Sequence, residues 1–246
     1  TPVYFCNGKK INAGWVTTFN NYAVVSENRI TKLPKNLTMK QGVIFGCALT
    51  TAYGVIFNDA KISKKDELLI IGSGNIGLPM VLFAKLAGCK KVVVVDKNNS
   101  KLILSKKFGS DECIHFSNEK LLKKEIQKIF ANKMPNKIID NTGNKKMIEF
   151  SYKILNNNGT LVLVGVPHYK KKISINTLPL HMGKKLKGSH GGGVNPNKDI
   201  VKILKLINGK LNLNNLIGKV YNLSNINKAI NNMRNGREKL KPIIKF

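Results

Sequence analysis

A glycine-rich segment, residues 72–77 with the sequence GSGNIG, is the clearest candidate in this chain for a chemical role, because of the spacing of its glycines. Between a strand and a helix, Gly72 permits a tight turn, Gly74 lets the backbone approach a pyrophosphate, and Gly77 lets the helix pack closely on the sheet. Free N–H groups at the start of such a helix attract phosphates. The segment therefore predicts a dinucleotide site.

An acidic residue, Asp96, ends the next apolar run about 20 residues after this loop. A carboxylate at this point can accept hydrogen bonds from the adenosine ribose hydroxyls, and it repels a 2′-phosphate. We therefore expect NAD(H) rather than NADP(H), a preference that Lys97 and Lys101 would soften. An alternative interpretation is that Asp96 caps the helix that follows it.

The residues around the loop predict alternating strands and helices. Residues 67–71 form an apolar run without alternation, as expected of a parallel strand buried on both faces, and residues 91–95 form a second one. Residues 78–87 have helical spacing. Further helices are expected at 100–108, 119–130 and 145–155, and further strands at 112–114, 137–140 and 160–165. The pattern predicts an α/β fold with a doubly wound parallel (Rossmann) sheet.

The two ends of the chain have a different pattern. Up to about residue 40, short apolar runs such as 15–19 and 22–25 alternate with turn residues, which predicts β-rich structure with a strand at 22–25. Residues 43–56 are expected to form a helix. Near the other end, helices are expected at 198–208 and 226–235, and strands at 219–222 and 242–246.

Composition limits the class of protein. The 246 residues carry a formal net charge of +29, but the lysines are scattered, so we interpret the charge as compositional bias and expect no nucleic-acid partner. No stretch approaches the run of about 18 apolar residues that spans a bilayer, so we expect a soluble, cytoplasmic protein with no membrane partner. Four widely spaced cysteines, Cys6, Cys47, Cys89 and Cys113, favour reduced thiols.

Several segments together resemble the medium-chain zinc-type alcohol dehydrogenases. They are residues 46–54 (GCALTTAYG), the glycine loop, Asp96 and residues 106–111. The likeness extends along the whole chain through residues 17–24, 165–167, 186–189 and 234–236. The resemblance implies a remnant of the β-rich catalytic domain at residues 1–48, an NAD-binding Rossmann domain at 49–189 and a returning segment of the catalytic domain at 190–246.

In that family, the cysteine that matches Cys47 is a ligand of the catalytic zinc, which acts as a Lewis acid on the substrate oxygen. Judged alone, Cys47 would more simply be a small core residue. The family's other zinc ligands and its proton-relay hydroxyl have no counterpart in this sequence, which begins at Thr1, so we expect a fragment that holds zinc only if those ligands are supplied. The histidines are interpreted as surface or loop residues: His115, His168, His181 and His190.

The resemblance also implies the residues of the NAD site. Thr51 is expected near the nicotinamide, Ile76 behind its ring, Lys101 near the adenosine ribose and Lys241 near the pyrophosphate. The other expected cofactor-binding residues are Gly72, Gly74, Asn75, Gly77, Asp96, Asn141, Thr142, Val164, Val166 and Ser189.

As a whole, the resemblance implies an NAD(H)-dependent oxidoreductase that transfers hydride between an alcohol or aldehyde and nicotinamide. This chain alone is expected to catalyse little or nothing. Residues 173–176 resemble the edge strand through which such cofactor domains pair, which implies a homodimer or homotetramer. Two alternatives stay open: a zinc-free relative of the quinone reductase type, and a non-catalytic dinucleotide-binding or nucleic-acid-binding module.

Overall fold

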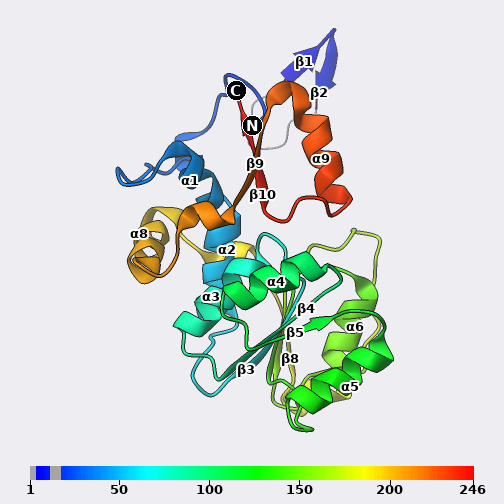
Figure 1. Cartoon of the computed structure of the whole chain (residues 1–246). Coiled ribbons are helices and arrows are strands. Elements are labelled where there is room, and N and C mark those ends of the chain that lie inside the picture. Colours follow the sequence, from blue (N-terminus) through cyan, green and yellow to red (C-terminus); the bar gives the residue numbers. More distant parts are fainter. Residues whose placement is uncertain (1–3, 12–17) are drawn as a thin grey trace.

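The computed structural model of this chain describes residues 4–11 and 18–246, so residues 15–17 of the predicted apolar run lie outside it. A parallel sheet with the order β5-β4-β3-β6-β7-β8 forms the centre of the lower half of the molecule (Figure 1). Its strands are β3 (Glu67–Ile71), β4 (Lys91–Asp96), β5 (Glu112–His115), β6 (Lys137–Asp140), β7 (Thr160–Leu163) and β8 (Lys185–Gly188).

The uniformly apolar sequence of the central strands follows from burial on both faces of the sheet. Successive side chains of a strand point to opposite faces. Leu68 and Ile70 of β3 accordingly belong to one core cluster, and Leu69 and Ile71 belong to the other. Each of the four is at most 2% exposed, and burying a side chain of this size contributes roughly 1.5–3 kcal/mol.

Helices cover both faces of this sheet, which makes the fold doubly wound. One core cluster includes residues of α2 (Ala48–Gly54), α3 (Gly77–Leu86), α4 (Asn99–Lys107) and α8 (Pro196–Ile207). The other includes residues of α5 (Glu119–Ile129) and α6 (Lys145–Ile154). The predicted α/β class with a parallel Rossmann sheet is therefore confirmed. We call the sheet and these covering helices the sheet lobe.

Asparagines begin three of these helices. The side-chain oxygens of Asn98, Asn118 and Asn144 accept hydrogen bonds from backbone N–H groups in the first turns of α4, α5 and α6. An amide oxygen at the N-cap satisfies a donor that the helix itself cannot pair. The abundant asparagine of this sequence thus has a structural use at helix starts.

A second group of elements lies above the sheet lobe in Figure 1 and comes from both ends of the chain. Strands β9 (Ile217–Asn222) and β10 (Lys241–Lys245) pair in parallel, with α9 (Ile226–Arg234) between them in sequence; we call these three elements the return lobe. The remaining elements are the strands β1 (Tyr4–Cys6) and β2 (Lys9–Ile11), the helices α1 (Met39–Phe45) and α7 (Leu178–His181), the π-helix η2 (Val55–Asp59), which continues α2, and the short 3-10 helices η1 (Glu27–Arg29), η3 (Gly191–Gly193), η4 (Leu213–Leu216) and η5 (Leu223–Asn225). The domain boundaries at residues 48 and 189 stay predictions.

Two strands expected from the sequence are not strands in the structure. Residues 22–25 and 173–176 both lie outside every described strand, because no described strand runs beside them to complete a hydrogen-bonded ladder. The apolar side chains of the first segment are not covered either: Tyr22 is 93% and Val24 is 74% exposed. An alternating pattern predicts a strand only where a neighbouring strand is available.

Two further differences have local causes. The single helix expected at residues 43–56 is interrupted, because Cys47 has φ −155° and ψ −62°, which are not helical angles, so α1 and α2 are separate helices. The prediction also missed β8. Lys185 and Lys187 interrupt its apolar pattern, and they can do so because this strand lies at the edge of the sheet.

Helix α2 belongs to the protein core. Its residues Leu49 and Ala52 are fully buried. No single helix in the described part of the chain is long and apolar enough to cross a bilayer; the bent pair Met39–Phe45 and Ala48–Asp59 meets that test by length and composition only when the two helices are taken together.

Helix α2 contacts η3 through backbone atoms. A Cβ built on Gly54 would lie 2.2 Å from the carbonyl oxygen of Gly192, and a Cβ on Gly192 would lie 2.8 Å from the carbonyl oxygen of Thr51. The Asn58 side chain also donates a hydrogen bond of 2.9 Å to the Gly192 carbonyl. The two segments therefore pack with no side chain between them.

We expect Gly54→Ala to lower the free energy of unfolding by about 3 kcal/mol, since overpacking a filled interior typically costs about 1–3 kcal/mol and here the added methyl meets backbone. Gly46→Ala is the control, because its Cβ would make an ordinary contact 3.5 Å from the Val43 carbonyl. Urea unfolding of both variants measures the difference. Equal stability of the two would contradict the packing argument.

Candidate functional site

A cavity of about 220 Å³ lies at the carboxyl ends of β3 and β6, where the strand order of the sheet reverses direction. In doubly wound sheets, ligands bind at this switch point. The cavity is lined by Gly72, Gly74, Asn75, Ile76, Gly77, Asn141, Val164 and Gly165. All but Gly165 are predicted cofactor-binding residues. Two larger hollows, of about 460 and 650 Å³, contain none of the predicted residues.

The structure distinguishes the three glycines of the loop by their backbone geometry. Gly72 has φ +90°, a conformation that favours glycine, and its N–H donates to the Val95 carbonyl at 2.8 Å. A Cβ on Gly77 would lie 2.0 Å from the Gly72 carbonyl oxygen, so the first turn of α3 must approach the loop without a side chain. A Cβ on Gly74 would meet nothing within 4 Å. The loop is therefore closed at one end and open at Gly74.

Asp96 joins this loop to the next crossover. Its Oδ2 accepts a hydrogen bond of 2.8 Å from the Ser73 N–H, and its Oδ1 accepts one of 2.9 Å from the Asn98 N–H. A carboxylate oxygen can accept more than one hydrogen bond, so the side chain is held in place and still has acceptor capacity. The N-cap of α4 is Asn98, so the alternative interpretation of Asp96 as that cap is wrong.

A buried carboxylate shapes the opposite wall of the cavity. Asp140 has no exposed surface and accepts hydrogen bonds from the N–H groups of Thr142 and Gly143, at 3.1 and 2.9 Å, and from the Thr142 hydroxyl at 2.9 Å. Burial raises the pKa of this carboxyl, and the three hydrogen bonds offset part of that rise. Asp140 thereby fixes the turn that presents Asn141 to the cavity.

The side chain of Asn141 is only half satisfied. Its Nδ2 donates to the Gly72 carbonyl at 3.2 Å, which links the β6 turn to the glycine loop. Its Oδ1 is buried and has no hydrogen-bond partner among the described residues, and the same holds for the hydroxyl of Ser73 in the loop. Buried polar atoms are nearly always paired, so an unpaired acceptor beside a cavity fits a ligand that brings a donor. The site therefore suits a ligand that donates hydrogen bonds, such as one with free hydroxyl groups.

Several predicted residues lie outside the cavity lining. Val166 follows β7 and is 92% exposed. Ser189 follows β8, where its N–H donates to the Leu163 carbonyl at 2.8 Å and its hydroxyl accepts from the Gly192 N–H at 3.0 Å. Lys101 lies on α4, and Lys241 begins β10 in the return lobe. The structure describes their positions but does not bring their side chains together around this cavity.

Cys47 and Thr51 line a different cavity, of about 450 Å³, beside the start of α2. Cys47 is exposed, so the interpretation of it as a core residue is wrong. A catalytic zinc needs three protein ligands. The described ranges contain no group of three His, Cys, Asp or Glu side chains that could hold a metal ion. Cys47 is therefore placed as one donor, and the described residues do not by themselves fit a zinc ion.

Three residues of the site are not among the cofactor-binding residues expected above. Gly165 lines the cavity, and a Cβ there would lie 2.2 Å from the Gly143 backbone nitrogen; its place two residues after β7, in a segment that shares the family likeness, is the signal that points to it. Asp140 was visible only as an acid at the end of an apolar run. Asn98 gave no signal beyond its position two residues after Asp96.

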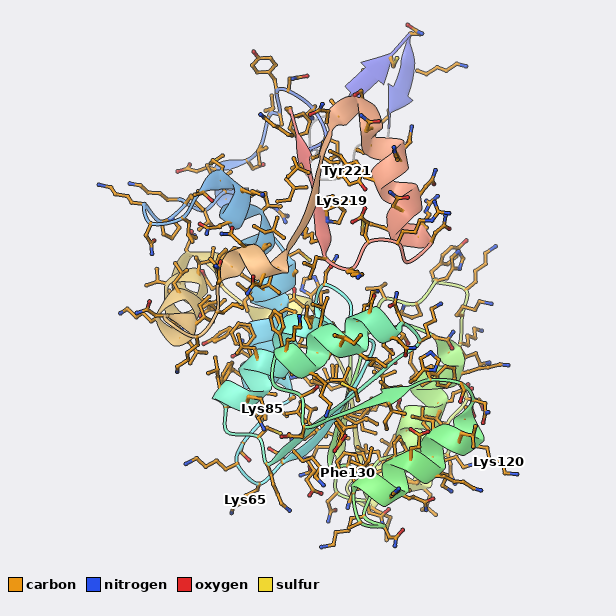
Figure 2. All side chains as sticks on the ribbon, in the orientation of Figure 1. Lys65, Lys85, Lys120, Phe130, Lys219 and Tyr221 are labelled. Atoms are coloured by element: carbon orange, nitrogen blue, oxygen red, sulfur yellow. The ribbon has the colours of Figure 1, made fainter. Side chains whose placement is uncertain are left out.

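Basic side chains cover the outside of the molecule. Figure 2 shows Lys65 and Lys120 on opposite sides of the sheet lobe, each pointing away from the core that contains Phe130. Six salt bridges occur in the described part of the chain, against 42 lysine and arginine residues in the sequence. The lysines are therefore mostly solvated, in agreement with their scattered positions in the sequence.

The strand order and the glycine loop at its switch point define a doubly wound fold of the dinucleotide-binding type. The family model for zinc-binding dehydrogenases matches residues 75–209, more than half of the chain. This chain belongs to the zinc-binding dehydrogenase family.

Individual relatives give the same result. The chain is 28% identical to alcohol dehydrogenase class-2 isozyme 2 of Oryctolagus cuniculus, over 96% of this chain, and 29% identical to alcohol dehydrogenase 6 of Peromyscus maniculatus, over 94%. Among solved structures, benzyl alcohol dehydrogenase from Acinetobacter calcoaceticus matches with a TM-score of 0.85 and 27% identity over 94% of this chain. The chain spans 63% of the length of each of these three proteins.

We expect Asp140→Asn to change how stability depends on pH. The amide oxygen can still accept from the two N–H groups, and the variant has no buried charge. Because the pKa of Asp140 is raised in the folded state, its contribution to stability is complete below the unfolded pKa of about 4 and is lost as the pH rises through the folded value. Urea unfolding from pH 4 to pH 8 should show that the free energy of unfolding of the variant increases relative to that of the wild type as the pH rises. A difference between the two that does not depend on pH would refute this.

Proposed function

We propose that this chain is the cofactor-binding part of an NAD(H)-dependent oxidoreductase of the zinc-type alcohol dehydrogenase kind. The cavity of about 220 Å³ carries the proposal, because it lies at the switch point and is lined by the glycine loop and Asn141. Membership of the zinc-binding dehydrogenase family and the alcohol dehydrogenase relatives support it.

The residues of the site would hold NAD(H) from several sides. The open position at Gly74 would let backbone N–H groups approach the pyrophosphate at the start of α3. Asp96, whose carboxylate already accepts two backbone hydrogen bonds, would accept further hydrogen bonds from the ribose hydroxyls of adenosine. The unpaired Oδ1 of Asn141 would accept a hydrogen bond from the cofactor. The bound nicotinamide supplies hydride transfer, and the residues of this chain position it.

The preference for NAD(H) over NADP(H) is part of the proposal. The carboxylate of Asp96 lies beside the loop, where a 2′-phosphate would bring a second negative charge close to it. Lys101, on the helix that follows, is the basic residue that the family likeness places near the adenosine ribose. The remaining predicted contacts, Thr51, Thr142, Val164, Val166, Ser189 and Lys241, are proposed as members of the same site.

Cys47 is proposed as one ligand of a catalytic zinc. Its exposure at the edge of a cavity, beside Thr51, supports the zinc-type reading over the zinc-free, quinone reductase type. The ion would polarise the substrate oxygen, and its other protein ligands would come from the part of the relatives' length that this chain does not span.

The substrate, assembly and compartment follow from the same family likeness. We propose a small alcohol or aldehyde as substrate, since the two relatives named above are alcohol dehydrogenases and one of the matched structures is a benzyl alcohol dehydrogenase. We also propose a homodimer or homotetramer in the cytoplasm.

Titration of this chain with NADH, followed by the fluorescence of the cofactor, tests the proposal. We expect saturable binding, with weaker binding of NADPH because of Asp96. A zinc assay of the same sample should give less than one ion per chain, since Cys47 is a single donor. A folded chain that does not bind NADH would refute the proposed function.

Gly74→Ala should weaken NADH binding by about tenfold or more, because the methyl group would occupy the open space where the backbone approaches the pyrophosphate. Its thermal unfolding should stay close to that of the wild type, because the Cβ meets no atom within 4 Å. Gly188→Ala on β8 is the matched control, since its Cβ also meets nothing and it lies outside the cavity. Unchanged affinity in Gly74→Ala would contradict the assigned position of the pyrophosphate.

A further inference from the structure

Asn98 lies where three segments of the chain meet: the turn after Asp96, the start of α4 and the turn at Gly236, which follows α9. Its backbone N–H donates to Asp96 Oδ1 at 2.9 Å. Its side-chain Oδ1 accepts from the N–H and the hydroxyl of Ser100, at 3.0 and 2.7 Å, and so caps α4. Its Nδ2 donates to the carbonyl oxygen of Gly236 at 3.3 Å, across 138 positions of sequence. One side chain therefore connects the sheet lobe to the return lobe.

The carbonyl of Gly236, which accepts this hydrogen bond, lies in a hydrogen-bonded turn. Gly236 has φ +68° and ends α9: its N–H donates to the Met233 carbonyl at 3.1 Å, and the Arg237 N–H donates to the Asn232 carbonyl at 2.9 Å. This pair of hydrogen bonds is a Schellman motif, which fixes the direction of the chain as it leaves a helix. The Gly236 carbonyl that receives the Asn98 amide is thus part of a defined turn.

The segment that follows this turn is also tied to its own lobe. The Tyr221 hydroxyl of β9 donates to the Glu238 carboxylate and accepts from Asn232 Nδ2 at 3.1 Å (Tyr221 is labelled in Figure 2). At the end of the segment, a Cβ on Gly218 would lie 3.0 Å from the Lys241 carbonyl oxygen, so β9 and β10 are in close backbone contact there. These contacts connect the turn at Gly236 to the start of β10, where Lys241 lies.

We propose that Asn98 is a positioning residue for the cofactor: it holds the return lobe against the sheet lobe and so fixes Lys241, proposed above as a contact of the pyrophosphate, relative to Asp96, proposed as a contact of the adenosine ribose. The inference rests on the proposed function, because it needs a dinucleotide that both residues contact. Asn98 itself acts through Gly236 and need not touch the cofactor. Its amide group suits this task, since the oxygen is used for the cap and the nitrogen for the contact between lobes.

The test compares Asn98→Ser with Asn118→Ser. Serine is a good N-cap, so both variants keep a capped helix, but the shorter side chain at position 98 cannot reach Gly236. Asn118 caps α5 in the same way, with Oδ1 accepting from the Leu121 N–H at 3.0 Å. We expect the NADH dissociation constant to rise about fivefold in Asn98→Ser, the usual effect of losing one neutral hydrogen bond, and to change less than about twofold in Asn118→Ser.

Two further measurements separate positioning from a general loss of structure. The inhibition constant of adenosine, measured as a competitor of NADH, should stay unchanged in Asn98→Ser, because adenosine carries no phosphate for Lys241 to meet. In a Lys241→Ala background, Asn98→Ser should cause no further loss of NADH affinity, because the two substitutions remove the same interaction.

The outcomes are distinct. Failure of the wild-type chain to bind NADH refutes the proposed function and the inference with it. If the wild type binds and Asn98→Ser matches Asn118→Ser, only the inference is wrong. Equal weakening of adenosine and NADH, or full additivity with Lys241→Ala, also overturns it, since Asn98 would then act through the Asp96 turn alone.

Discussion

The site depends on backbone segments that approach too closely for any side chain to lie between them. At the carboxyl edge of the sheet, a Cβ on Gly77 would lie 2.0 Å from the Gly72 carbonyl, and a Cβ on Gly165 would lie 2.2 Å from the Gly143 nitrogen. The glycine loop, the turn after β6 and the end of β7 therefore pack through peptide groups. The lining of the cavity is more apolar than polar, and its polar groups come from these backbone segments and from the asparagine side chains. The two core clusters, one on each face of the sheet, hold the segments in place.

How much the sequence could predict differs between the parts of the molecule for physical reasons. Strands β3 and β4 were predictable because burial on both faces leaves an uninterrupted apolar run, whereas β8, at the edge, tolerates Lys185 and Lys187. The glycine loop was predictable because its spacing is local. The role of Asn98 was not predictable, because it depends on a contact with Gly236, far away in sequence. The role of Asp140 was not predictable either, because a single acidic residue in a sequence does not indicate that its side chain is buried. The exposure of Cys47 likewise follows from the break between α1 and α2, which the apolar pattern concealed.

Different features of the molecule would attract an anionic ligand and hold it: the charge of the surface for the first and the lining of the cavity for the second. The residues that line the cavity are all uncharged, so contacts inside it are hydrogen bonds and apolar contacts and not ion pairs. The excess of basic residues lies outside, where 42 lysines and arginines face 13 acidic residues in the sequence. A field of that sign raises the local concentration of anions at low ionic strength and fades as salt screens it. The compositional bias of the sequence thus favours encounter with a dinucleotide without specifying it.

The two hydrogen bonds of Asp96 have a consequence for how this protein can evolve. The carboxylate that would discriminate between the two nicotinamide cofactors also anchors the Ser73 N–H of the glycine loop. Losing it to admit a 2′-phosphate would leave that donor, on a residue with 1% exposure, without its acceptor. A lineage that changed its cofactor at this position would need a second substitution to rebuild the loop. Until such a second substitution restored an acceptor for the Ser73 N–H, the loss of the Asp96 carboxylate would be expected to lower the stability of the folded chain.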